Sequence, residues 1–225
     1  MTGRPPAPTR ERILRAAVKE FSRQGFRGGR VERIARQAKA NLRMIYHYFG
    51  NKEGLYLASL EQVYLELRTA EQALNLGKAE PIEGIKRFVD YTFDHFIRHP
   101  EFIGMLVSEN QLGARHLRRS RVVSKLTPPL LAIEDLLERG ARAGVFRGQV
   151  DPVQFFVTLH ALCYLHGANR NTLSVMFQTD LSDQTWLAAR KRHVLDVVFG
   201  YLCVPDAAVK RSTKRQTRSS MGVEP

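Results

Sequence analysis

Glycine and proline residues divide this chain into segments that each have the length of a helix. Gly25, Pro100 and Gly144 fall where an apolar periodicity stops, and Pro81 and Pro152 stand where a helix can begin, because proline is tolerated in a first helical turn. Between these breaks, apolar residues recur at spacings of three and four, and no stretch of strand length alternates with period two. The sequence therefore predicts an all-α fold.

Residues that can cap a helix refine these segments. Thr9, Asn41, Asp151 and Ser182 each precede an apolar-periodic run and can accept a hydrogen bond from the free N–H groups of a first turn. The helices are expected over residues 9–24, 31–38, 42–49, 52–76, 81–99, 101–110, 115–125, 128–143, 152–169 and 183–204.

Positive charge is concentrated at the N-terminal end of the chain. Residues 1–60 hold thirteen Lys and Arg against four Asp and Glu, and residues 61–205 hold seventeen against sixteen, within a net charge of +13. A basic head on a nearly neutral body is typical of a module that binds a polyanion. A solvated basic surface would carry the same charge, so a motif is needed to decide between the two.

Residues 31–49 contain such a motif. An apolar stripe covers one face of a short helix, a tight turn follows, and Asn41 can cap a second short helix. The second helix is expected to point Leu42, Ile45 and Phe49 inward and Arg43, Met44, Tyr46 and His47 outward. This is the pattern of a helix-turn-helix, whose second helix fits the major groove of DNA.

The residues of this head resemble a known family. The run Ile34-Ala35, then Ile45-Tyr46-His47-Tyr48-Phe49, then Asn51-Lys52-Glu53-Gly54-Leu55, is similar to the heads of tetracycline-repressor (TetR) family regulators. The resemblance covers about residues 9–56. It implies a sequence-specific transcriptional regulator, most often a repressor that a small molecule releases from a palindromic operator. Double-stranded DNA and an unknown inducer are then the expected partners.

The head should contact DNA through a defined set of side chains. The expected DNA-binding residues are Arg30, Asn41, Arg43, Met44, Tyr46, His47, Tyr48 and Lys52. The resemblance implies that Lys52 holds a phosphate, that Arg30 and Asn41 anchor phosphates, and that the aromatic residues reach base edges and backbone. Arg43 can either read a guanine or hold a phosphate. Lys39 stands where the family usually has a turn glycine.

Two late segments, residues 153–165 and 194–202, are apolar almost all round. A helix of that kind must bury two faces, one in its own core and one against a partner. We expect a homodimer through residues 151–169 and 182–202, with Val198 and Phe199 in the seam, as a symmetric four-helix interface. The alternative is a monomer in which both helices are central.

A small-molecule pocket is expected within residues 80–180. Aromatic residues exceed what these helices need for a core, and the family resemblance adds that such bodies bind ligands. The expected lining is Phe93, Phe96, Phe102, Met105, Asn110, Phe156, His160 and Tyr164. The alternative is a solid core, which aromatic stripes at helical spacing usually form.

Other functions find less support in the sequence. No glycine-rich phosphate loop and no nucleophile with a neighbouring base is evident, so neither an enzyme nor a cofactor is expected. His95 and His99 have a zinc-compatible spacing but lack an evident third ligand, so no metal is expected. A purely architectural nucleic-acid protein would explain the charge but not the long neutral body.

The sequence also suggests a compartment and a division into parts. It shows no run of eighteen apolar residues and no signal peptide, and its two cysteines lie in apolar segments, which together favour a cytoplasmic protein without a membrane span. The expected parts are a basic flexible arm (1–8), a DNA-binding head (9–56), a helical sensor and dimerisation domain (57–205) and a disordered basic tail (206–225).

Overall fold

The computed structural model describes residues 8–121 and 128–204, and within these ranges it is helical. The elements are α1 (Thr9–Gly28), α2 (Val31–Ala38), α3 (Leu42–Phe49), α4 (Lys52–Ala73), η1 (Leu76–Lys78), α5 (Pro81–Arg98), α6 (Pro100–Gln111), η2 (Leu117–Arg119), α7 (Pro128–Arg142), α8 (Pro152–Ala168), α9 (Arg170–Phe177) and α10 (Gln184–Leu202). The predicted all-α fold is confirmed. In the described ranges, β-type pairing is limited to a single bridge between Phe146 and Cys203.

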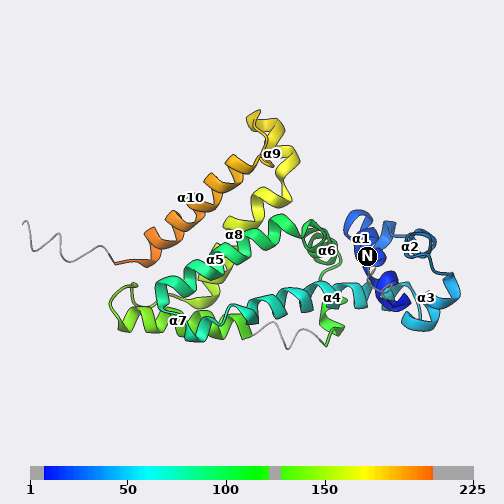
Figure 1. Ribbon diagram of the computed structural model, residues 1–225, viewed down its shortest axis with the longest axis horizontal. Helices are drawn as coiled ribbons and strands as arrows, with labels where there is room; N and C mark the ends of the chain where they lie inside the picture. The colour runs from blue at the N-terminus through cyan, green and yellow to red at the C-terminus, as the bar shows by residue number, and fades with distance from the viewer. Residues whose placement is uncertain (1–7, 122–127, 205–225) are drawn as a thin grey trace, which may run out of the picture.

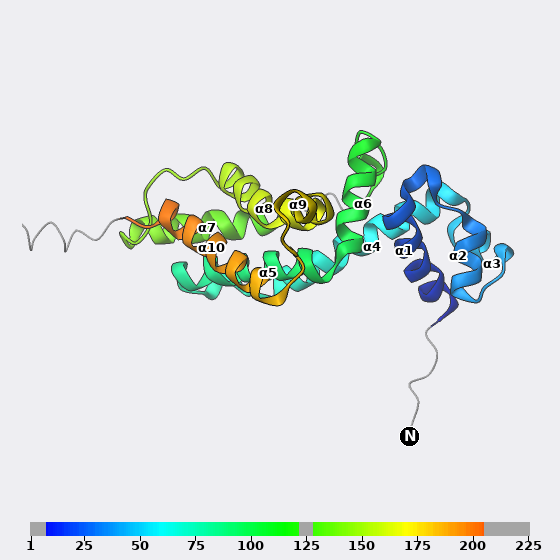
Figure 2. The same ribbon diagram turned by 90° about the horizontal axis from the view of Figure 1, so that it is seen from above.

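The molecule is elongated, with a small head at one end and a larger body at the other (Figure 1, Figure 2). Helices α1, α2 and α3 form the head, and α4 runs from the head into the body. In the body, α5 packs against α7, α8 and α10. None of the helices in the described part of the chain is long and apolar enough to cross a membrane.

Local side chains fix the starts of several helices. Asn41, Asn51, Asp151 and Asp183 each accept a hydrogen bond from the backbone N–H three residues later, at 2.8–3.0 Å. Each bond satisfies a donor that the first turn cannot pair internally. Proline occupies the first turn of α5, α6 and α8, where its missing N–H costs nothing.

The head is fastened to the body through α6. Gly104 lies against the backbone of α1. Four residues further along α6, the Ser108 hydroxyl accepts hydrogen bonds from the Phe26 N–H and from the Tyr56 hydroxyl, both at 3.1 Å. One turn of α6 thus touches both α1 and α4.

The structure corrects several expected boundaries. A helix was expected over residues 115–125, but the described part of this range contains only the short η2 turn. The backbone N–H groups of His116 and Leu117 donate to the buried Glu109 carboxylate, so they do not pair as in an α-helix. The last helix is capped by Asp183, since Ser182 donates its hydroxyl and its N–H to Asp180. Helix α9 was not expected at all.

Three further differences concern single positions. Thr9 is the first helical residue and has no capping role, and α4 ends at Ala73 rather than near Leu76. Gly25 has the positive φ expected of a helix stop, 63°, but α1 resumes for one turn beyond it. The expected N-terminal arm and basic tail lie outside the described residues, apart from Pro8.

Candidate nucleic-acid interface and internal cavity

The turn between α2 and α3 sets the angle at which α3 leaves the head. Lys39 adopts the left-handed conformation, with φ 50° and ψ 48°. A side chain with a Cβ is strained there, whereas glycine is not. Asn41 then opens α3 by accepting from the Met44 N–H. The turn is the tight one that the sequence predicted, closed by a residue that does not favour its conformation.

Helix α3 lies at the end of the molecule furthest from the body (Figure 2), and the face that it exposes to solvent is polar and aromatic. Arg43, Tyr46, His47 and Tyr48 are all exposed, with Tyr46 at 47% of its full accessibility. Their exposure leaves this face open to a macromolecular partner, and the face combines a cation with three hydrogen-bonding rings.

Two positions of α3 are exchanged relative to the expectation. Leu42, expected to point inward, is 38% exposed, and Met44, expected to point outward, is half-buried and packs against the core. The helix has only eight residues and buries a narrow stripe centred on Ile45. Met44 and Phe49 flank that stripe, so Leu42 is left outside it.

Lys52 lies at the start of α4, next to the end of α1. Its Nζ donates to the Arg27 carbonyl oxygen at 3.3 Å and lies 5.1 Å from the centre of the Phe26 ring. The aliphatic part of the side chain is therefore held against the head while the ammonium group stays at its edge. Such a group can meet a phosphate without first being ordered.

The start of α2 is stabilised from outside its own sequence. Arg30 is exposed and provides no side-chain cap, but its backbone N–H donates to the Glu20 carboxylate at 3.0 Å. Arg33 also donates to that carboxylate at 2.7 Å. Burial would raise the pKa of Glu20, but these hydrogen bonds hold it below its ordinary value. The Arg30 side chain remains available for a ligand outside the head.

An acidic residue next to Lys52 is neutralised by the body. Glu53 accepts hydrogen bonds from Arg115 at 2.9 Å and from Arg119 at 3.0 Å. The hydrogen bond from Arg115 lowers the pKa of Glu53. Its negative charge is therefore compensated and does not oppose an anion at Lys52.

The body contains a cavity of about 280 Å³ between α4, α5, α6 and α8. Four of the eight expected pocket residues line it: Phe96, Phe102, Phe156 and His160. The other four lie outside its lining, for different reasons. Phe93 stacks on His166 with ring centres 5.0 Å apart, Met105 is fully buried in the core, Asn110 is exposed, and Tyr164 packs edge-on against Phe96.

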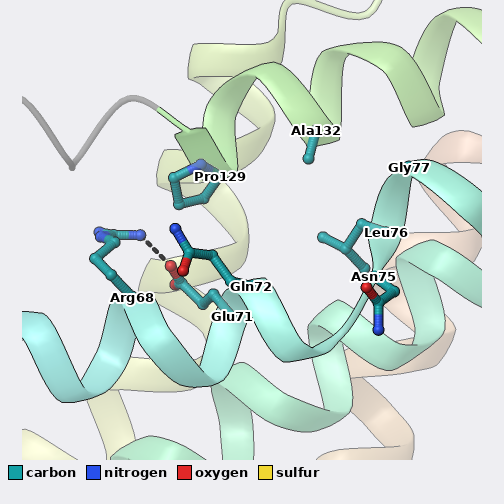
Figure 3. Close-up of a pocket in the computed structure, with 8 residues that line it drawn as sticks. All are labelled: Arg68, Glu71, Gln72, Asn75, Leu76, Gly77, Pro129 and Ala132. Atoms are coloured by element: carbon teal, nitrogen blue, oxygen red, sulfur yellow. Dashed lines mark hydrogen bonds and ion pairs between the residues drawn. The ribbon is translucent and has the colours of Figure 1, made fainter.

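Sequence reasoning missed two charged residues in this cavity, Arg68 and Glu71 of α4. They form a buried ion pair, and both also line a second cavity of about 220 Å³ next to α7 (Figure 3). Burial raises the pKa of Glu71 to about 7, against the lowering effect of Arg68. The available signal was the i, i+3 spacing of opposite charges on the apolar side of α4.

Two protein-family models match this chain, one at its N-terminal part and one over its C-terminal part. The family described as bacterial regulatory proteins, tetR family, matches residues 13–59. The family described as tetracyclin repressor-like, C-terminal domain, matches residues 81–198, which is more than half of the chain.

Individual proteins agree with these matches. The chain is 39% identical over 177 residues to the HTH-type transcriptional repressor NicS of Pseudomonas putida, covering 78% of this chain and 84% of that one. It is 38% identical over 146 residues to the HTH-type transcriptional repressor SCO4008 of Streptomyces coelicolor, covering 62% and 70%.

A solved structure has the same fold at low sequence identity. The ketosteroid transcriptional regulator KstR2 of Mycobacterium tuberculosis superposes with a TM-score of 0.67 at 20% identity, over 89% of this chain and 97% of that one. An exposed recognition helix on a basic head, an all-helical body and two family matches lead to one conclusion: the chain belongs to the tetracycline-repressor (TetR) family of DNA-binding transcriptional regulators.

Proposed function

We propose that this DNA-binding repressor binds a palindromic operator as a homodimer and is released when a small molecule occupies the cavity of the body. Residues 9–56 then serve as the DNA-binding domain and residues 57–205 as the sensor and dimerisation domain. The observation that carries the release step is the position of α6. Its Phe102 and Leu106 line the cavity, while its Gly104 and Ser108 contact the head.

At the DNA, the exposed face of α3 lies in the major groove. Arg43, Tyr46, His47 and Tyr48 reach base edges and the adjacent backbone. Arg30, Asn41 and Lys52 hold phosphates at the margins of the helix, where cations and helix N-termini suit anions. Half-burial of Met44 gives it a supporting role behind this face, with at most a contact through its exposed edge.

The homodimer uses the outer faces of α8 and α10. Val153, Val157 and Leu165 form an exposed apolar stripe at multiples of four residues on α8, and Val197 and Tyr201 continue the pattern on α10. Monomeric proteins rarely expose contiguous apolar surface of this kind. A two-fold interface between these stripes places two heads on half-sites about 34–36 Å apart.

Release follows from a difference in ligand affinity between two arrangements of the heads. A ligand that fits the cavity better when α6 has shifted must lower operator affinity by the same factor by which DNA lowers its own affinity. The ligand thereby changes the spacing of the heads without touching DNA.

The test combines operator selection with ligand screening. DNA bound by the full chain is selected from a random pool, and a two-fold symmetric consensus is expected. Compounds that raise the melting temperature of the protein are then added to the protein–operator complex and should reduce binding. An asymmetric or absent consensus contradicts the operator proposal, and stabilising compounds that leave operator affinity unchanged contradict the release proposal.

A further inference from the structure

The Arg68–Glu71 pair lies in the lining of both cavities described above. Arg68 is 7% exposed and Glu71 is 5% exposed, so both charges are buried. Figure 3 shows the two side chains joined on one wall of the second cavity, with Pro129 and Ala132 of α7 on the other. Burying two charges costs several kcal/mol per ion before their attraction is counted. A pair in this position calls for a reason other than stability.

The hydrogen-bonding capacity of the pair is not used up. The Arg68 Nη1 donates to Glu71, but the buried Arg68 Nε has no partner in the described part of the chain. A buried donor left unpaired costs about 1–3 kcal/mol. Arg68 also lines the cavity, so a ligand bound there lies next to a guanidinium whose donors are not all used.

The rest of the cavity is suited to a flat ring. Tyr64, Phe96, Phe102 and Phe156 line it together with Leu106. The other polar lining residues are Thr92, His95 and His160. The His160 Nδ1–H donates to the Phe156 carbonyl at 2.9 Å, so that the neutral ring leaves Nε2 as an acceptor. A volume of about 280 Å³ lies near the small end of the range for ligand pockets and fits a compound built on a single ring.

The chemistry of the pair decides the charge of that compound. Arginine does not lose its proton in proteins, so a cation placed here would leave two permanent positive charges beside one carboxylate. An anion leaves two carboxylates beside one guanidinium, and one of them can become neutral by protonation. Glu71 can take up this proton near neutral pH, because burial raises its pKa to about 7. The site therefore accepts an anion more readily than a cation.

We propose that the cavity binds a small aromatic carboxylate, whose carboxylate pairs with Arg68 and whose ring lies among Phe96, Phe102 and Phe156, while Glu71 takes up one proton. The inference rests on the proposed function, since it names the class of ligand for the same cavity. It explains why an ion pair is kept on the buried side of α4: Glu71 holds Arg68 in place until the ligand replaces it.

The titratable groups around Glu71 do not take up a proton near neutral pH, which leaves Glu71 as the proton acceptor. From α5, Tyr91 has its pKa raised to about 12 by burial, and His95 has its pKa lowered to about 4 by burial. From α8, burial also lowers the pKa of His160 to about 4, and from α4 itself burial raises the pKa of Tyr64. The α7 residues that face Glu71 across the second cavity, Pro129 and Ala132, do not titrate. Among these groups, Glu71 is therefore the one that changes its charge near neutral pH.

The test uses calorimetric titration of the full chain with benzoate and para-hydroxybenzoate. The matched amides and benzylamine serve as neutral and cationic probes. We expect both acids to bind and the other probes not to bind. The binding constant should be nearly flat below pH 7, where Glu71 already carries its proton, and fall about tenfold per pH unit above it, where one proton is taken up per ligand. Above pH 7, titrations in buffers of different ionisation enthalpy measure that proton directly.

Two variants and a control separate this site from nonspecific binding. Arg68→Met should abolish binding of the acids, and Glu71→Gln should retain it with an affinity that no longer depends on pH. Glu66→Gln makes the same change at an exposed position of α4 and should behave as wild type. If Arg68→Met does not fold, as judged by circular dichroism, Glu71→Gln decides: loss of the pH dependence supports the proposal and its retention overturns it.

Other results overturn the proposal outright. These are failure of both acids to bind the folded wild type, equal binding of an amide or of benzylamine, or binding of the acids to folded Arg68→Met. The readout involves no DNA, so its failure is distinct from that of the proposed function. Acids that bind without lowering operator affinity leave this inference standing and contradict ligand release. If a neutral or cationic compound releases the operator and the acids do not bind, ligand release stands and this inference is overturned.

Discussion

Gly104 of α6 and Ser22 of α1 are in backbone contact: a Cβ on Gly104 would lie 2.2 Å from the Ser22 carbonyl oxygen. The neighbouring atom belongs to the backbone of α1, so it cannot move aside as a flexible side chain could. At this point the backbone of the head therefore lies directly against the backbone of the body, with no side chain between them. Any shift of α6 is passed directly to α1.

Replacement of Gly104 by alanine should displace the head. The added methyl group forces α1 and α6 apart, and overpacking of this kind costs about 1–3 kcal/mol. We expect a lower free energy of unfolding in urea and weaker operator binding. Gly148→Ala is the control, because a Cβ there meets nothing within 4 Å. Equal effects of the two substitutions would show that the contact between α6 and α1 does not hold the head.

Replacement of Lys39 by glycine should stabilise the head. Lys39 has φ 50°, a conformation that costs a residue with a Cβ about 1 kcal/mol and costs glycine little. The midpoint of urea unfolding should therefore rise in Lys39→Gly, whereas Lys39→Ala keeps the strain and should leave it nearly unchanged. If alanine stabilised the protein as much as glycine, removal of the lysine charge would be the cause instead.

Lys52 and Arg43 should affect DNA binding in different ways. Lys52→Ala removes a proposed phosphate contact, so it should weaken specific and nonspecific binding about equally and flatten the salt dependence by about one unit. Arg43→Ala should reduce the preference for the operator over random DNA if Arg43 reads a base. Fluorescence anisotropy across a salt series measures both quantities. Unchanged affinity in both variants would contradict the placement of α3 at the DNA.

The outer stripes of α8 and α10 should hold the dimer together. Val157 is 59% exposed and Tyr201 is 48% exposed in the single chain, so Val157→Asp and Tyr201→Asp place charges in the proposed seam without disturbing the core. Both variants should sediment as folded monomers at micromolar concentration. Leu131→Asp, at an exposed apolar position of α7, should remain dimeric. A wild-type chain that is monomeric under these conditions would rule out the interface.

Acid should destabilise the protein through its buried histidines. Burial lowers the pKa of His166, which stacks on Phe93, from 6.5 to about 4. Between these pH values the unfolded chain binds a proton that the folded chain does not. The contribution of His166 to the free energy of unfolding is therefore complete above pH 6.5 and is lost as the pH falls toward 4. The loss is on the order of 3 kcal/mol. Glu71, whose folded pKa is raised, acts in the opposite direction between pH 7 and 4.5.

The comparison of two proteins isolates the histidine. In His166→Phe, which keeps a flat ring against Phe93, the free energy of unfolding should fall less between pH 7 and pH 5 than in wild type, with Glu71 common to both. Urea unfolding followed by circular dichroism at several pH values gives the difference. Parallel curves for the two proteins would show that His166 is not neutral in the folded state.

The features that the sequence determined by itself are local. Asn41 and Asp151 cap their helices through bonds to residues three positions away, and the apolar stripe from Val31 to Ala38 depends only on the helical period. The recognition helix follows from the same local rules, which is why its bounds were predicted from residues 31–49 alone. Its period did not settle every position, since Leu42 and Met44 differ only in how they meet the rest of the head.

The tertiary structure decided everything that depends on contacts between distant segments. Val198 was expected in the dimer seam, but it is 3% exposed in the single chain and belongs to its core, whereas its neighbour Val197 faces outward. A helix that is apolar all round carries no periodic signal to say which face meets which partner. For the same reason the burial of Arg68 and Glu71 could not be predicted: their charges favour solvent in isolation, and only the packing of α5, α6 and α7 around α4 places them inside.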